Sequence, residues 1–399
     1  MGFQTLDDLT VAGSAVGVRV DINSPLTSDA ELADDARLRA HVDTLSELLE
    51  REGRVAILAH QGRPGGDEFE GLAAHANRLD ELLDGPVEYT DATFSAAARD
   101  AIDELGRGEA ILLENTRFYS EEYMEFEPER AAQTHLVGRL APHLDAFVND
   151  AFAAAHRSQP SMVGFAHILP SYAGRIMERE IEVLGNVDET PSPRAYVVGG
   201  AKIPDSMTVI RHSLEQGLAD EILTTGLVAN VFLLAAGYDL GDGSADVIYD
   251  RGHWEEIDRA ADLLEEYPEK IHVPADVAVE RGGERVELDV ESLPPNADET
   301  IKDIGSETVE MYQTILEDTG TAILNGPAGV FEEPYFRTGT ERLFQIVAES
   351  GFSIVGGGDT SAAVRRFGID GFDHVSTGGG AALRLLTGER LPAIEVLKR

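Results

Sequence analysis

The chain has 399 residues, of which 43% are hydrophobic, so it is long enough to bury large cores and to form two domains. It carries 73 Asp and Glu residues against 32 Lys and Arg residues, and the net charge of −41 disfavours nucleic acid and anionic membranes as partners. It has no cysteine, which excludes disulfides, thiolate metal sites and cysteine nucleophiles.

The acidic residues are spread along the whole chain, and only Lys202, Lys270, Lys302 and Lys398 are lysines. A disordered acidic tail would collect its charges in one block, so a solvated surface explains the pattern better. Such a surface suits molar salt, where the Debye length falls to about 3 Å and self-repulsion is screened.

No apolar run approaches the roughly eighteen residues of a membrane helix, and no signal-peptide pattern is present. We therefore expect a soluble, cytoplasmic protein from a halophilic source.

Short apolar runs rich in Val, Ile, Leu and Ala alternate along the chain with segments of helical periodicity. Continuous apolar strands that alternate with helices predict parallel sheets covered on both faces, with ligands beyond the carboxyl ends of the strands. The runs predict strands at residues 15–20, 55–59, 110–113, 146–148, 195–198, 221–223, 322–324 and 352–355. Helices are predicted between them, among others at residues 38–52, 130–140, 206–216 and 361–367.

Two further segments concern the organisation of the chain. Residues 171–187 have a helical pattern and precede the Pro-rich segment 189–193, which predicts a helix and a linker between two halves. Residues 273–288 alternate around Gly282 and Gly283, which predicts a β-hairpin inserted in the second half.

The strand ends of the first half carry arginine and histidine side chains, although the protein as a whole is strongly acidic. The planar fork of arginine suits bidentate binding of phosphate or carboxylate, so convergent arginines predict a pocket for a small molecule with both groups. A single Arg would more often pair with a neighbouring carboxylate, and it is the convergence of four segments that favours a site. The residues concerned are Arg37, His60, Arg63, Arg117, His156 and Arg157.

Other polar residues after strands are weaker signals when they are taken one by one. Asp21 and Asn23 could hydrogen bond to a substrate hydroxyl, but an Asx-turn before Pro25 is the simpler explanation. Lys202 follows two glycines after a strand, where its ammonium could neutralise a moving phosphoryl group. Glu332 could bind a ribose hydroxyl, although a lone Glu more often lies on the solvated surface.

The strongest local signal is the segment 354–362, which reads as an apolar strand, three glycines and the start of a helix. The glycines permit close backbone approach, and the helix N-terminus attracts phosphate. Asp359 would offer a hard oxygen ligand to Mg²⁺, although Asp359 or Thr360 could serve only as a helix N-cap. Residues 376–381 repeat the pattern, so a phosphate cradle explains both turns better than two independent caps. Neither turn is a Walker A loop or a dinucleotide fingerprint.

The motifs of the chain, and the order in which they follow one another, resemble those of phosphoglycerate kinase along essentially the whole length of the sequence. Eight ordered matches make coincidence implausible. They lie at residues 19–23, 60–64, 112–118, 148–152 with 156–157, 199–202, 325–332, 356–360 and 376–380.

The resemblance implies reversible phosphoryl transfer between 1,3-bisphosphoglycerate with ADP and 3-phosphoglycerate with ATP, with Mg²⁺ accompanying the nucleotide. It implies an α/β fold of two doubly wound parallel-sheet domains of similar size that face a cleft and close over their ligands. Residues 1–170, with a C-terminal tail at about 386–399, would bind 3-phosphoglycerate; residues 171–190 would connect the domains; and residues 191–385 would bind the nucleotide. We expect a monomer rather than a dimer.

The resemblance also implies roles for individual positions. Arg63, Arg117 and Arg157 would hold the substrate phosphate, Arg37 would face the carboxylate, and Lys202 would guide the transferring phosphoryl group. Catalysis would involve Arg37, Lys202, Gly357 and Gly380. Substrate would be bound by Asp21, Asn23, Arg37, His60, Gln61, Gly62, Arg63, Arg117 and Arg157. Nucleotide would be bound by Gly199, Lys202, Gly226, Asn325, Glu332, Gly357, Gly358, Asp359 and Thr360, with Asp359 as the Mg²⁺ ligand.

One departure from the family pattern concerns the position four residues after Lys202. Many family members have a second lysine there, whereas this chain has Ser206. One phosphate contact is therefore missing or replaced. Serine at this position is similar to archaeal members of the family, and together with the acidic composition it points to a haloarchaeal source.

Two other classes of protein are weighed against this interpretation. An NAD-dependent dehydrogenase shares the doubly wound architecture, but no strand ends in the required glycine fingerprint with an acidic residue about twenty positions later. A binding protein that clamps an anion between two domains explains the arginines but not the glycine turns. Calorimetric binding of MgADP separates the three alternatives.

The acidic composition predicts that stability depends on salt. We expect the unfolding midpoint to rise steeply with KCl, because added ions screen the repulsion among the carboxylates. Thermal unfolding followed by circular dichroism over a KCl series checks this. Equal stability at low and molar salt would contradict a halophilic adaptation.

Overall fold

The computed structural model describes residues 2–296 and 299–398. The chain divides into two compact units, one formed by Met1–Glu182 with Arg390–Arg399 and the other by Val183–Glu389. The division therefore falls inside the segment 171–190, and each unit is described here by itself.

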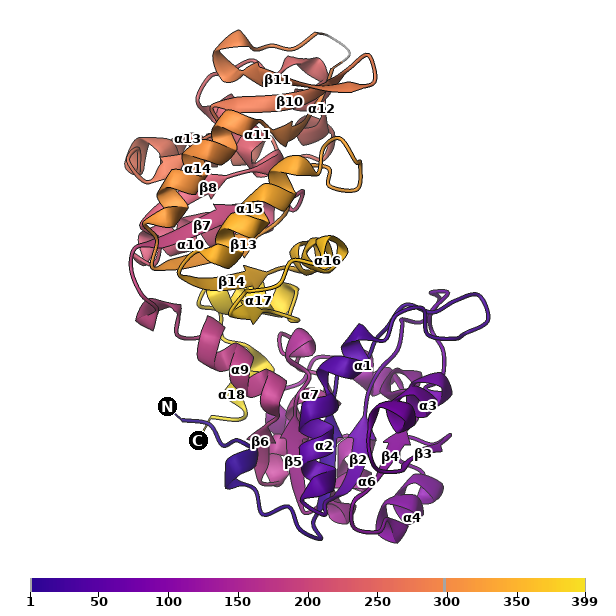
Figure 1. Ribbon diagram of the computed structural model, residues 1–399. Coiled ribbons are helices and arrows are strands. Elements are labelled where there is room, and N and C mark those ends of the chain that lie inside the picture. The colour runs from indigo at the N-terminus through magenta and orange to yellow at the C-terminus, as the bar shows by residue number, and fades with distance from the viewer. Residues whose placement is uncertain (1, 297–298, 399) are drawn as a thin grey trace. The chain divides into compact units, whose positions relative to one another are not determined.

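The first unit contains a sheet of six parallel strands in the order β3-β4-β2-β1-β5-β6 (Figure 1). The strands are β1 (Ala15–Arg19), β2 (Arg54–Leu58), β3 (Val87–Thr90), β4 (Glu109–Leu113), β5 (Ala146–Asn149) and β6 (Ser171–Ala173). The helices are α1 (Ala36–Ala40), α2 (Val42–Glu50), α3 (Ala73–Leu82), α4 (Ala96–Glu104), α5 (Pro128–Ala131), α6 (His135–Leu140), α7 (Pro160–Val163), α8 (Phe165–Ile168), α9 (Arg175–Leu184) and α18 (Pro392–Glu395).

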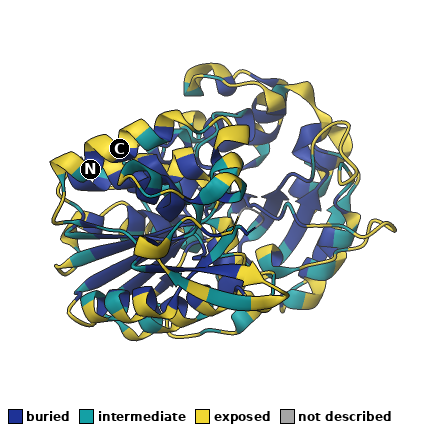
Figure 2. Cartoon of the chain, turned by 90° about the horizontal axis from the view of Figure 1, so that it is seen from above, coloured by how far each residue is buried: buried dark blue, intermediate teal, exposed yellow. Residues whose placement is uncertain are grey.

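The sheet of the first unit is buried on both faces, because side chains alternate between the faces of a strand. In β2, Val55 and Ile57 belong to one apolar cluster, and Ala56 and Leu58 belong to another. Figure 2 shows the strands buried and the outer faces of the helices exposed. This double coverage explains why the central strands read as continuous apolar runs in the sequence.

The second unit also contains six parallel strands, in the order β15-β14-β13-β7-β8-β9. They are β7 (Arg194–Val198), β8 (Glu221–Thr224), β9 (Ile271–His272), β13 (Thr321–Asn325), β14 (Phe352–Gly356) and β15 (His374–Val375). The helices are α10 (Ile203–Glu215), α11 (Gly226–Ala235), α12 (Gly241–Asp250), α13 (Glu255–Glu266), α14 (Ser306–Glu317), α15 (Thr338–Glu349), α16 (Gly358–Phe367) and α17 (Gly380–Leu386).

A smaller antiparallel sheet lies in the same unit, in the order β11-β10-β12. Its strands are β10 (Asp276–Arg281), β11 (Glu284–Asp289) and β12 (Ile301–Ile304). β10 and β11 form the hairpin predicted around Gly282 and Gly283, with Arg281 opposite Glu284. The third strand, β12, was not predicted.

The fold class predicted from the sequence is confirmed, and so are the central strands, with ends that shift by at most one residue. The sequence analysis missed β3, β6, β9 and β15, which are the four edge strands of the two large sheets. Edge strands here have two to four residues, and they lack the apolar runs of strands that are covered on both sides.

Three predicted helices differ in the structure. The helix predicted at 130–140 is divided into α5 and α6, and the one at 38–52 is divided at His41 into α1 and α2. The helical segment predicted from residue 171 begins as strand β6, and α9 starts only at Arg175. Sheet pairing with β5 overrides the helical pattern at Ser171–Ala173.

None of the described helices is both long enough and apolar enough to cross a membrane.

Tyr312 on α14 connects the helix layer to the sheet of the second unit. Its buried hydroxyl lies 2.8 Å from the carbonyl oxygen of Thr224 and 3.0 Å from that of His272. We expect Tyr312→Phe to lower the free energy of unfolding by about 1–3 kcal/mol, because it removes the hydroxyl donor to the buried Thr224 carbonyl. Urea unfolding checks this, with the exposed Tyr335→Phe as a control that should stay within about 0.5 kcal/mol of the wild type. A Tyr312→Phe variant as stable as the control would contradict the assignment.

Candidate active site

The end of β1 carries a fully buried arginine. The Arg19 guanidinium donates through Nε to the Ser161 hydroxyl at 3.0 Å and lies 2.9 Å from His60 Nδ1. Ser161 in turn donates to the buried Glu122 carboxylate, from its hydroxyl at 2.6 Å and its backbone N–H at 2.8 Å. Burial, and then the charge of Arg19, hold the pKa of His60 well below its ordinary value. His60 is therefore a neutral imidazole held in place by Arg19.

Asp21 follows β1 and organises the next polar groups. Its carboxylate pairs with Arg37 at 2.9 Å and accepts the N–H of Asn23 at 3.2 Å. Burial favours a higher pKa for Asp21, but His60, Arg37 and Arg19 together outweigh it and hold the pKa below the ordinary value. Asp21 is thus ionised, and Arg37 remains half-exposed beside it.

The backbone of Asp21 is fixed by a second buried pair. Its N–H donates to His41 Nε2 at 3.0 Å, and His41 Nδ1 lies 2.7 Å from the Asp150 carboxylate. The other oxygen of Asp150 accepts the N–H groups of Ile176 and Met177 in the first turn of α9, at 2.9 and 3.4 Å. The start of α9 and the turn after β1 are therefore joined through two buried side chains.

A cavity of about 580 Å³ opens beyond these strand ends. It brings together five of the residues predicted from the sequence, whereas Asp21, Arg37 and His60 lie outside its immediate lining. The lining residues are Asn23, Leu26, Gly62, Arg63, Gly66, Asp67, Glu68, Arg117 and Arg157.

Two arginines of this cavity have buried nitrogens without partners among the described residues. These are Nε of Arg117 and one terminal nitrogen of Arg157. Burial, and then the charges of Arg157 and Arg19, lower the pKa of Arg117 to about 10. Burial likewise lowers the pKa of Arg157. A bound anion would satisfy these nitrogens and relieve the mutual repulsion.

Gln61 supports the cavity from behind. Its side chain bonds to both backbone groups of Ser24, at 2.9 and 2.8 Å, and lies 3.1 Å from His75 Nε2. Its buried amide is therefore committed to holding the loop. The side chain does not line the cavity of the described structure.

In the second unit, the loops that follow β7, β8 and β13 are joined by backbone hydrogen bonds. Gly199 N–H donates to Asn325 O at 2.8 Å, and Gly226 N–H donates to Ala328 O at 3.0 Å. A Cβ at Gly199 would lie 2.1 Å from Thr225 Oγ1, and one at Gly326 would lie 2.3 Å from Gly199 O. Glycine is required at both positions because the loops touch.

The turn before α16 lies beside these loops. Gly357 precedes the helix, and Thr360 in its first turn accepts the N–H of Gly326 at 2.8 Å. Lys202 Nζ lies 3.1 Å from Asp359 Oδ2, and both side chains are about two-thirds exposed. The structure therefore brings Lys202, Asn325 and the 357–360 turn to one sheet edge, where first-turn amides remain available to phosphate.

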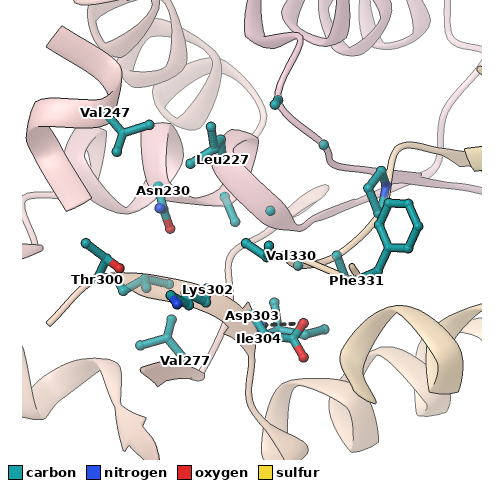
Figure 3. Close-up of a pocket in the computed structure, with 18 of the residues that line it drawn as sticks. Leu227, Asn230, Val247, Val277, Thr300, Lys302, Asp303, Ile304, Val330 and Phe331 are labelled. Atoms are coloured by element: carbon teal, nitrogen blue, oxygen red, sulfur yellow. Dashed lines mark hydrogen bonds between the residues drawn. The ribbon is translucent and has the colours of Figure 1, made fainter. Parts of the chain in front are cut away.

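A second cavity, of about 500 Å³, extends from this edge toward the small antiparallel sheet (Figure 3). Gly226, Glu332 and Asp359 line it, together with the apolar side chains of Leu227, Val277 and Val330. Glu332 is exposed at the mouth. Gly380 begins α17 and does not belong to the lining of this cavity.

Ser206, which replaces the second lysine expected from the family pattern, is buried on α10. Its hydroxyl donates to the carbonyl oxygen of Gly199 at 3.3 Å. It therefore supports the loop after β7 and supplies no positive charge. Among the described residues, no three His, Cys, Asp or Glu side chains cluster as a metal site.

The two sites belong to a chain that matches a known protein family. The family model for phosphoglycerate kinase matches residues 6–389. The chain belongs to the phosphoglycerate kinase family. It is therefore a phosphotransferase of glycolysis and gluconeogenesis.

Similar phosphoglycerate kinases are known from several archaea and bacteria. The chain is 63% identical over 398 residues to that of Halobacterium salinarum, covering 100% of both chains, and 63% identical over 397 residues to that of Natronomonas pharaonis, covering 99% of both. It is similar in structure to the phosphoglycerate kinase of Pyrococcus horikoshii OT3, with a TM-score of 0.91 and 42% identity, over 99% of this chain and 98% of that one. The haloarchaeal resemblance predicted from composition and Ser206 is confirmed.

Sequence reasoning did not assign roles to several buried groups of this phosphoglycerate kinase. Arg19 was visible as a charged residue within the apolar run 15–20, but no local pattern connected it to Glu122. His41 and Asp150 are separated by 109 positions, so their pairing had no signal in the sequence.

His75 predicts a pH dependence of stability. Burial lowers its pKa to about 4, against about 6.5 in the unfolded chain, so the unfolded state binds the proton first. The free energy of unfolding should therefore fall by up to about 3 kcal/mol as pH drops from about 6.5 to about 4. Urea unfolding at a series of pH values should show a flatter profile for His75→Gln, while the exposed His135→Gln should match the wild type. Identical profiles for all three proteins would exclude a role for His75.

Proposed function

We propose that the chain phosphorylates the carboxylate of 3-phosphoglycerate with ATP, reversibly, with substrate bound on the first unit and nucleotide on the second. The full-length family match over residues 6–389 carries this assignment. The two units then have separate tasks, and the transfer requires them to close so that the ligands meet.

The first-unit cavity supports the substrate assignment. Arg117 and Arg157 would bind the phosphate group, because their buried guanidinium nitrogens without partners suit a dianion. Arg63, which is exposed and lines the same cavity, would bind it with them. Asn23 lines the same cavity, and the ionised Asp21 and neutral His60 support its floor. Arg37 is half-exposed and can turn toward the reacting carboxylate. Gln61 and Gly62 would act through the loop that they form rather than through side-chain contact.

The second unit supports the nucleotide assignment. The amides at Gly357, Gly358 and Thr360 would bind phosphate at the start of α16, with Gly199 and Asn325 closing the other side. Gly226 and Glu332 lie in the cavity that would receive the nucleoside. Gly380 begins the second glycine-led helix and would contribute a further amide.

We propose that Mg²⁺ accompanies the nucleotide with Asp359 as a protein ligand. The exposed carboxylate of Asp359 lines the cavity, and Mg²⁺ commonly takes one or two carboxylates together with phosphate and water oxygens. When bound, the ion neutralises phosphate charge.

The reaction needs no deprotonation by the protein, because the nucleophile is an ionised carboxylate. A carboxylate oxygen forms a bond to the γ-phosphorus, the bond to the β,γ-bridging oxygen breaks in line, and ADP leaves. The protein aligns the reactants, neutralises charge and excludes water. Lys202 is an exposed cation on a long side chain beside the proposed phosphate turn, so it could follow the transferring group.

We further propose that the enzyme acts as a cytoplasmic monomer. Each unit has its own buried core, and no second copy is required to complete either cavity. Light scattering in molar KCl tests the monomer.

Lys202→Ala tests the function and the assigned role together. In a coupled assay of 3-phosphoglycerate phosphorylation by MgATP at high salt, we expect kcat to fall by about 100-fold with little change in KM, because Lys202 acts on charge that develops during transfer. Lys398→Ala, which removes a lysine of the first unit that pairs with Glu395, should leave both constants unchanged. A folded wild type without activity would overturn the function, and an active Lys202→Ala with unchanged kcat would overturn the role.

A further inference from the structure

The nucleoside cavity of the second unit is lined largely by apolar side chains, and one of its polar lining residues carries a side-chain amide. α11, α12, the start of β12 and the loop after β13 form its sides, and Leu227, Val247 and Val330 point into it (Figure 3). The amide belongs to Asn230 on α11. A mostly apolar cavity with a single side-chain amide is suited to a heteroaromatic ring that has polar atoms on one edge.

Asn230 is held in place by the fold but has no partner. It is 3% exposed, and its side chain makes no hydrogen bond to any residue in the described part of the chain. It lies four residues after Gly226, and therefore on the same face of α11. Figure 3 shows its amide pointing from α11 toward Thr300 and Lys302. Because the amide faces the cavity and bonds to no described residue, its donor and its acceptor are available to a ligand.

The neighbouring charged groups are already engaged. Lys302 Nζ pairs with Glu280 at 2.8 Å and with Glu333 at 2.9 Å. The Asp303 carboxylate pairs with Arg285 at 2.7 Å and accepts the N–H of Gly339 at 2.9 Å. Asn230 is therefore free to face the ligand, whereas Lys302 and Asp303 hold β12 in place.

We propose that Asn230 determines the base specificity of the enzyme by reading the edge of adenine. The amide oxygen would accept from the 6-amino group, and the amide nitrogen would donate to N7. Hypoxanthine has two acceptors on the same edge, so the amide oxygen would face the 6-oxo group without a hydrogen bond. This inference rests on the proposed function, because it assigns a ligand to the nucleoside cavity.

MgITP is the sharpest probe, since it differs from MgATP at the 6-position of the ring. We expect the wild type to use MgATP at least about tenfold better than MgITP in kcat/KM at high salt. Asn230→Leu keeps the branching at Cγ and removes both polar groups. It should reduce the ratio to about twofold or less, mainly through loss of activity with MgATP.

Two controls separate base reading from cavity shape. Val247→Ala removes apolar contact in the same cavity and should weaken both nucleotides alike, which leaves the ratio unchanged. Leu227→Trp fills the cavity and should raise KM for both. If Asn230→Leu does not fold, Asn230→Ala replaces it, and calorimetry with MgADP and MgIDP gives the same comparison without turnover.

The outcomes distinguish the role of Asn230 from the proposed location of the nucleotide site. A wild-type ratio near one, or a ratio that both Asn230 variants preserve, would overturn the role of Asn230. An active Leu227→Trp variant with unchanged nucleotide KM would instead show that the nucleoside binds elsewhere, and the proposed nucleotide site would fail with it.

Discussion

The second unit depends on how closely three of its loops approach one another. The backbone of Gly199 and Gly200 donates to Asn325 and Pro327, both at 2.8 Å, and these contacts leave no room for a side chain at Gly199. Such loops cannot move independently, because breaking one of these backbone hydrogen bonds would leave a polar group unsatisfied. The rim of the second-unit cavity and the turn at Gly357 are therefore held together as one surface. Rigid donors that are already oriented bind phosphate without reorganisation.

The first unit meets a different constraint, which is the cost of burying cations. The protein has a large excess of carboxylates, so a partner for any exposed arginine is easily found. Arg19 receives such compensation from Glu122 through Ser161. Arg117 and Arg157 retain buried nitrogens without partners, even in this acidic chain. Their incomplete pairing is therefore better explained by a ligand anion than by a shortage of carboxylates.

Ser206 concerns both the packing of the loops and the number of cations at the site. A lysine there would add charge close to the phosphate turn, whereas the Ser206 hydroxyl stabilises the carbonyl of Gly199. The loop is held more firmly and the site has one cation fewer. In the proposed nucleotide site, the nucleotide charge would then depend more on backbone amides and on the Mg²⁺ proposed at Asp359. In molar salt, where exposed charges are screened, amides oriented by the fold lose less of their effect than a surface lysine does.

The sequence by itself determined the fold class, the central strands and the family. Buried parallel strands need continuous apolar residues, and phosphate turns need glycine at set positions, so both leave local patterns. The cations after the strand ends were predicted for the same reason, since parallel strands bring their carboxyl ends to one edge. Individual roles for these residues stay predictions.

Only the tertiary structure decided which polar groups are free and which are engaged. Gln61 and Asn230 are both buried amides, yet Gln61 bonds to Ser24 and His75, while Asn230 faces a cavity. Edge strands such as β9 depended on pairing with a neighbour, and the His41–Asp150 pair joins residues 109 positions apart. Hydrogen bonds between distant segments arise from packing, and packing leaves no period in the sequence.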